Sequence, residues 1–257
     1  MIISLLSIGL ISILGQVALL RELNVAFYGV ELIYLLALGI WLFWTAAGAL
    51  IGRRIRVPSY AHITVLFILF GITLPLDVMF IRGSRLLFGS VPGAYLSFLQ
   101  QLMVAFISLL PAGMLSGLLF QWAAKIYVAD GRTVAIAYAI ESAGGVAGGM
   151  GATLFLTWGI QNCTIALACS LAAVITPLLF LRNTRISLLQ WVAMILAGIF
   201  LLALWKATPI DRQMTAWNHP NLLESRDSPY GRITMTRLSG QISVFENDGL
   251  AFETEGT

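Results

Sequence analysis

The sequence predicts an all-α, multi-pass membrane protein of about seven transmembrane helices, followed by a short β-hairpin segment of a truncated domain. The chain has 59% hydrophobic and only 11% charged residues, whereas soluble domains average about 25% charged residues. Its apolar residues fall into stretches of about 20, the length that crosses a bilayer. The composition turns polar after Trp205. We therefore expect a transmembrane domain over 1–205 and a polar linker with a hairpin over 206–257.

The apolar stretches give the expected spans in order. The first has no basic segment before it and no small-residue cleavage motif after it, so we interpret it as a retained span rather than a signal peptide. The fourth contains Pro111, which predicts a kink. The fifth is rich in glycine, and its pairs 144/148 and 145/149 predict close helix packing. The expected spans are 2–21, 30–52, 62–81, 95–122, 133–158, 162–181 and 187–205.

The basic residues between the spans predict the orientation. Loops after the second, fourth and sixth spans carry seven of them, and loops after the first, third and fifth spans carry three. The first set comprises Arg53, Arg54, Arg56, Lys125, Arg132, Arg182 and Arg185, and the second comprises Arg21, Arg82 and Arg85. Positive loops face the cytoplasm, so the N-terminus is expected there. Seven spans then place the C-terminal segment outside, and a miscount by one would place it inside.

The polar tail shows a strand pattern. Residues 232–238 and 241–245 alternate between apolar and polar side chains, as half-buried strands do. Ser239-Gly240 suits a two-residue hairpin turn, and Asn247-Asp248-Gly249 marks a second turn. We expect about three short strands and no helix here, which is too little to fold alone.

Three polar residues in the spans are candidates for an intramembrane site. Glu141 lies in the middle of the fifth span, where a carboxyl group faces a cavity or a partner. Gln16 and Arg21 lie on and just after the first span, close to Glu22. The functional interpretation is a ligand- or proton-binding site. The structural alternative is helix packing for Glu141 and an interfacial charge pair for Arg21.

Several classes of site are not predicted. Cys163 and Cys169 share one span without sharing a face, so neither a disulfide nor a metal site is expected. His62 and His219 have no ligand partners at metal-binding spacing. The sequence has no catalytic triad or phosphate-binding loop, and a net charge of +3 needs no nucleic-acid partner. No catalytic, cofactor-binding or metal-binding residue is assigned.

Two stretches give the chain a family resemblance. They are Gln16-Val17-Ala18-Leu19-Leu20-Arg21-Glu22-Leu23 and Asp227-Ser228-Pro229-Tyr230-Gly231-Arg232-Ile233-Thr234-Met235-Thr236, the latter continuing to Asn247-Asp248-Gly249. Together they resemble the membrane-bound spermidine synthase-like proteins, in which apolar spans precede an aminopropyltransferase domain. The resemblance implies decarboxylated S-adenosylmethionine as co-substrate of a full-length enzyme. This chain stops before the family's catalytic core, and Phe252 falls where the family has a glutamine.

Three functional hypotheses follow. The first is the membrane region of a spermidine synthase-like protein, anchoring an aminopropyltransferase-type domain carried on the same chain or on a separate one. The second is half of a small-solute transporter, for example for an amine, that uses Glu141. The third is a non-catalytic membrane scaffold. All three place the chain in the cell membrane with the lipid bilayer as partner, and all are compatible with a homo-oligomer.

Overall fold

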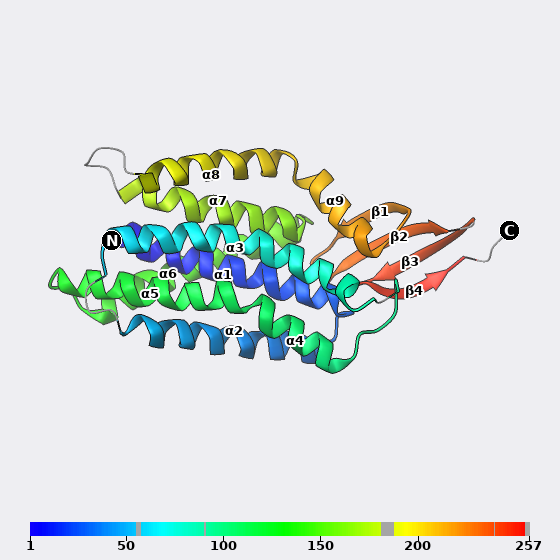
Figure 1. Ribbon diagram of the computed structural model, residues 1–257, viewed down its shortest axis with the longest axis horizontal. Helices are drawn as coiled ribbons and strands as arrows, with labels where there is room; N and C mark the ends of the chain where they lie inside the picture. The colour runs from blue at the N-terminus through cyan, green and yellow to red at the C-terminus, as the bar shows by residue number, and fades with distance from the viewer. Residues whose placement is uncertain (55–57, 90, 181–187, 239, 255–257) are drawn as a thin grey trace.

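The computed structural model describes residues 1–54, 58–89, 91–180, 188–238 and 240–254. The predicted loop residues Arg56, Arg182, Arg185 and Ser239 lie outside these ranges. Helices α1 to α8 run side by side along the long axis, with the N-terminus at one end and a β-sheet at the other (Figure 1). The helices are α1 (Ile2–Ala26), α2 (Glu31–Gly52), α3 (Tyr60–Leu87), α4 (Phe98–Ser108), α5 (Leu110–Ala129), α6 (Val134–Thr157), α7 (Asn162–Phe180), α8 (Leu188–Trp205) and α9 (Ala207–Asn218).

Six helical stretches of the described chain are long and apolar enough to cross a membrane, as expected of a multi-pass membrane protein. They are Ile2–Ala26, Glu31–Gly52, Tyr60–Leu87, Phe98–Ala129, Asn162–Leu179 and Leu188–Trp205. The expected count of about seven is not confirmed. The predicted fifth span forms helix α6, which carries five glycines and Glu141 and is not among these six stretches. The predicted kink is confirmed, because the helix breaks at Leu109 and restarts with Pro111 in the first turn of α5.

Helix α1 lies at the centre of the bundle and packs against α6 and α7, among others. Its contact with α6 is backbone to backbone: a methyl group added at Gly144 would overlap the carbonyl oxygen of Leu6, and one at Gly148 would press on Leu10. The predicted close packing through 144 and 148 is therefore confirmed. Cys163 and Cys169 are buried and unbonded to each other.

The polar tail begins with a helix, so the expectation of a linker without a helix is wrong. Helix α9 buries Ala207, Asp211, Met214, Thr215 and Asn218, which recur every three to four residues and form one face. The high polarity of residues 206–218 hid this periodicity, because the buried face is itself half polar.

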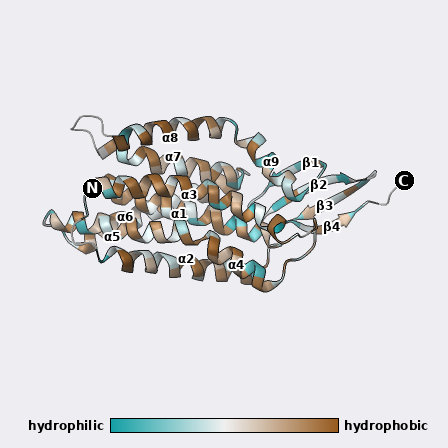
Figure 2. Ribbon diagram, in the orientation of Figure 1, coloured by the Kyte–Doolittle hydropathy of each residue, from teal (hydrophilic) through white to brown (hydrophobic). Residues whose placement is uncertain are grey.

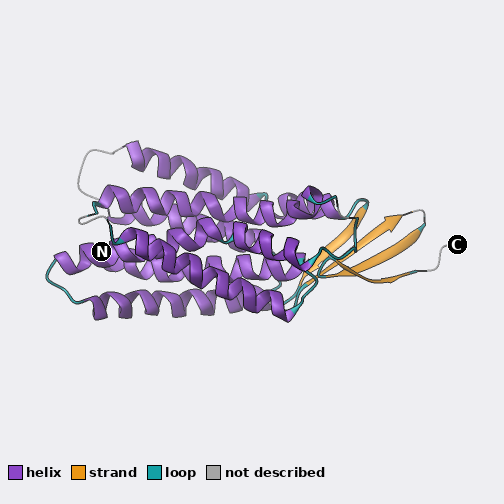
Figure 3. Ribbon diagram, turned by 60° about the horizontal axis from the view of Figure 1, so that its bottom comes forward, coloured by secondary structure: helices purple, strands orange, loops and turns teal. Residues whose placement is uncertain are grey.

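The sheet is an antiparallel meander in the order β1-β2-β3-β4 at the end of the bundle (Figures 1 and 3). Its strands are β1 (Leu222–Asp227), β2 (Arg232–Leu238), β3 (Gln241–Glu246) and β4 (Gly249–Glu253). The strands predicted at 232–238 and 241–245 are confirmed as β2 and β3, and the described sheet has four strands rather than three. Asn247 and Asp248 have φ values of 48° and 59°, as a tight hairpin turn requires.

Candidate functional site

Hydrophilic residues collect where the helices meet the sheet (Figure 2). Seven side chains in this zone form a hydrogen-bonded group that we call the junction cluster. Its members come from four helices and two strands: Arg21, Glu22, Arg82, Asn162, Asp211, Asp227 and Arg232. Three arginines face three carboxylates, so the formal charges of the cluster balance.

Arg82 of α3 is the most highly connected member. Its Nε and Nη2 atoms donate to the two carboxylate oxygens of Glu22 at 2.7 and 3.3 Å. Nη2 also donates to Asp211 Oδ1 at 2.6 Å, and Nη1 donates to the Asp211 carbonyl at 3.1 Å and to Thr215 Oγ1 at 3.3 Å. The guanidinium has five N–H groups, and five hydrogen bonds use them. A side chain only 3% exposed is thereby fully satisfied.

Arg232 brings the sheet into the cluster. From the first position of β2, its Nε and Nη2 atoms donate to the two carboxylate oxygens of Asp227 at 2.7 and 3.3 Å, across the β1–β2 hairpin. Its Nη1 atom donates to Glu22 Oε1 at 3.4 Å. Burial alone would lower the pKa of Arg232, but the charges of Glu22, Asp227 and Asp211 outweigh it and raise the pKa well above its usual value. Arg232 is therefore a permanent cation between helix and sheet.

Asn162 and Arg21 complete the cluster from the start of α7 and the end of α1. Asn162 Nδ2 donates to Glu22 Oε2 at 2.9 Å, and its Oδ1 accepts from Arg21 Nη1 at 2.8 Å. The Asn162 backbone N–H donates to Asp227 at 3.2 Å, so this carboxylate also sits favourably at the N-terminus of α7. Arg21 Nη2 donates to the carbonyl oxygen of Ser228 in the β1–β2 turn.

A second group, which we call the turn cluster, holds the other side of the sheet. It comprises Tyr28, Arg85, His219 and Asp248. Arg85 Nη1 donates to the Asp248 carbonyl at 3.1 Å, and His219 Nε2 lies 2.9 Å from Asp248 Oδ1. Tyr28 donates its hydroxyl to the Ala94 carbonyl at 2.7 Å and accepts from Arg85 and from the Leu96 amide.

Asp248 is charged in this setting. Burial would raise its pKa, but the hydrogen bond from His219 and the charges of His219, Arg232 and Arg85 outweigh burial and hold the pKa below its usual value. Beside it, Asn247 accepts from the Arg232 amide at 3.0 Å. A methyl group added at Gly231 would overlap Asn247, so only glycine permits this close approach between the two turns.

The structure places the three predicted site residues apart. Arg21 belongs to the junction cluster, where its hydrogen-bond partners are Asn162 and Ser228. Gln16 lies half-buried on α1 about one and a half turns earlier, and no side-chain hydrogen bond is found for it within the described chain. Glu141 is half-buried on α6, at the level of Gly9 on α1. The three do not form one intramembrane site.

Sequence reasoning missed Arg82, Asp211 and Arg232 as site residues. The available signal was that charged residues of opposite sign stand at the ends of separate apolar stretches. Every cluster carboxylate is held by arginine, so the junction cluster offers no free base or nucleophile. Within the described residues, no group of three or more His, Cys, Asp or Glu side chains could hold a metal ion. The arrangement is suited to fixing the sheet on the helices.

Comparison with family models, curated proteins and solved structures finds no match to this chain.

Proposed function

We propose that this chain is a membrane mount that holds a β-sheet in one fixed orientation as the base of an aminopropyltransferase-type domain of the spermidine synthase-like kind. The observation that carries the proposal is the junction cluster. Removing charges from water is unfavourable, and a buried ionic group is tolerated only when each charge keeps its partners. Tilting the sheet would separate Arg232 from Glu22, so that each of these buried charges would lose one of its partners. The balanced cluster therefore favours a rigid mount over a flexible linker.

The location of the cluster supports the choice of family. The two sequence stretches that resemble spermidine synthase-like proteins, 16–23 and 227–236, supply Arg21, Glu22, Asp227 and Arg232. These stretches lie about 200 residues apart in the sequence, yet they meet in one buried group. The resemblance thus maps onto the connection between membrane helices and sheet, which is the part that a mount needs.

The paired arginines also support an orientation with the N-terminus in the cytoplasm. The three basic residues counted on the sheet side, Arg21, Arg82 and Arg85, are buried. Of the basic residues counted on the opposite side, Arg53, Arg54 and Arg132 are exposed. Exposed loop charge is what the positive-inside rule counts, so the sheet is proposed to lie outside the cytoplasm. A domain mounted on it would then meet its substrates there.

The first test is the intact mass of the protein in its native membrane. A polypeptide much heavier than 28.0 kDa supports a mount fused to a further domain, and aminopropyl transfer from decarboxylated S-adenosylmethionine to putrescine is then assayed on the whole protein. If a fused domain is present but does not catalyse this transfer, the mount hypothesis is retained and the aminopropyltransferase assignment is rejected. A mass of 28.0 kDa with no co-purifying catalytic subunit would reject both.

Solute transport through Glu141 is the second candidate. Its half-buried carboxyl group does not line the crevice and grooves found among the described residues. The test is uptake of putrescine into proteoliposomes, with Glu141→Gln as the variant. Uptake that this substitution abolishes, in a protein that still folds, would favour transport over the mount.

A further inference from the structure

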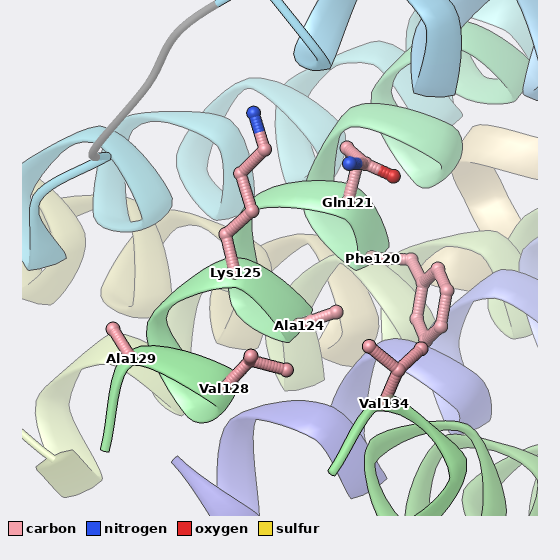
Figure 4. Close-up of a pocket in the computed structure, with 7 residues that line it drawn as sticks. All are labelled: Phe120, Gln121, Ala124, Lys125, Val128, Ala129 and Val134. Atoms are coloured by element: carbon pink, nitrogen blue, oxygen red, sulfur yellow. The ribbon is translucent and has the colours of Figure 1, made fainter. Parts of the chain in front are cut away.

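A crevice lies at the end of the bundle opposite the sheet, between the last turns of α5 and the start of α6. Its volume is about 370 Å³. The residues that line it are Phe120, Gln121, Ala124, Lys125, Val128, Ala129 and Val134 (Figure 4). The apolar stretch Phe98–Ala129 ends here, so the crevice sits where the hydrocarbon of a bilayer gives way to the headgroups.

The walls of the crevice are apolar. Phe120, Ala124, Val128 and Val134 supply most of the lining, and Val134 is 59% exposed. The Phe120 ring is held by an edge contact with Tyr138 of α6, with ring centroids 6.1 Å apart. A hydrocarbon chain has the shape and polarity that such a wall accepts.

The rim of the crevice is basic. The amine of Lys125 donates to the carbonyl oxygens of Gly52 and Arg53 at 2.9 and 3.0 Å, which places the end of α2 beside the crevice. Arg53 and Arg54 are exposed there, and so is Arg132, whose guanidinium stacks 4.7 Å from the Tyr127 ring. Within the described segments 52–54 and 125–134, four basic side chains face one acidic side chain.

We propose that this crevice binds an anionic phospholipid, with one acyl chain against the apolar wall and the phosphate headgroup among Arg132, Arg53 and Arg54. The proposal follows from two features that lie next to each other: an apolar slot at hydrocarbon depth and a cationic rim at headgroup depth. A zwitterionic lipid would fill the slot without matching the rim, and a free phosphate would match the rim without filling the slot. The site is independent of the proposed mount.

Native mass spectrometry of the detergent-purified protein tests the proposal. Phosphatidylglycerol and phosphatidylcholine with identical acyl chains are added separately. The wild type is expected to retain phosphatidylglycerol in preference. Arg132→Gln should weaken phosphatidylglycerol binding about fivefold, the effect expected of one basic residue near a lipid surface, and leave phosphatidylcholine binding unchanged. Lys206→Gln is the matched control, because Lys206 also stacks on an aromatic ring, but at the sheet end; it should change neither.

The slot is tested separately by filling it. Ala124→Phe should weaken retention of both lipids, and Val134→Phe repeats the test at an exposed position in case the first variant does not fold. Equal retention of the two lipids by the wild type, or unchanged retention in both filled variants, would overturn the proposal. Inorganic phosphate alone should not raise the melting temperature; a rise equal to that given by phosphatidylglycerol would also overturn it.

Discussion

The basic residues counted between the predicted spans differ in burial at the two ends of the helical bundle. At the sheet end, Arg21, Arg82 and Arg85 are buried and each donates to groups on other elements. At the N-terminal end, Arg53, Arg54 and Arg132 are exposed. A buried charge at the sheet end fixes the position of neighbouring elements, whereas an exposed charge at the N-terminal end is available to the membrane surface. Arginines that count equally in the sequence therefore play different physical roles. Replacing one should change the stability of the protein far more at the sheet end than at the N-terminal end.

The largest effect is expected from Arg82→Met, which removes one positive charge from the junction cluster and keeps an unbranched stem like that of arginine. Glu22 and Asp211 would remain buried without their main partner. Breaking a buried ion pair in this way destabilises a protein by about 3–5 kcal/mol. Chemical denaturation in detergent measures this loss in the free energy of unfolding. Arg226→Ala, which removes an ion pair whose side chains are 84% and 58% exposed, should stay within about 1 kcal/mol. Equal losses in the two variants would contradict the account.

The next effect concerns acid and the turn cluster. The folded-state pKa of Asp248 is lowered, so its stabilising contribution is complete above the unfolded value of about 3.9 and is lost as the pH falls through the folded value. Asp248→Asn should cost about 1.5–3 kcal/mol at neutral pH, the range for hydrogen bonds to a charged group. The gap between variant and wild type should shrink below about pH 4. A gap that does not change with pH would show that the charge of Asp248 does not matter.

Packing at the glycine interface gives a third contrast. Gly144→Leu would drive a side chain into the Leu6 backbone, and overpacking of this kind costs about 1–3 kcal/mol. Gly151→Leu is the matched control on the same helix, since nothing lies within 4 Å of the added atom. The melting temperature in detergent should fall for the first variant and not for the second. Similar melting temperatures would argue against the contact between α1 and α6.

The smallest effect is expected from Tyr28→Phe, which removes one hydroxyl from the turn cluster. The Ala94 carbonyl loses its 2.7 Å hydrogen bond, and the Leu96 amide loses its acceptor. Arg85 still donates to the Ala94 carbonyl, so the loss should be close to that of a single hydrogen bond, about 0.5–1.5 kcal/mol. The same denaturation assay measures the loss, and amide hydrogen exchange should become faster at Leu96. Unchanged exchange at Leu96 would mean that this hydroxyl does not hold the loop before α4.

The helices could be predicted because a membrane span has a local sequence pattern. It consists of about 20 apolar residues, with a proline at a kink or paired glycines at a close contact. Strands β2 and β3 and the turn at Asn247 left similarly local patterns. The junction cluster did not, because its members are spread from Arg21 to Arg232 and each looks like an ordinary interfacial charge. Helix α9 was missed for a related reason: its buried face uses Asp211, Thr215 and Asn218, which become suitable for burial only when Arg82 lies opposite.

The rigid mounting of the sheet is tested most directly by a distance between spin labels on the bundle and on the sheet. Exposed Thr157 at the end of α6 and exposed Arg237 on β2 are replaced by cysteine and labelled, with Cys163 and Cys169 replaced by alanine. Double electron–electron resonance should give one narrow distance distribution in the otherwise wild-type protein, and Arg82→Met should broaden it. A distribution that is already broad with the junction cluster intact, and that Arg82→Met leaves unchanged, would contradict the account.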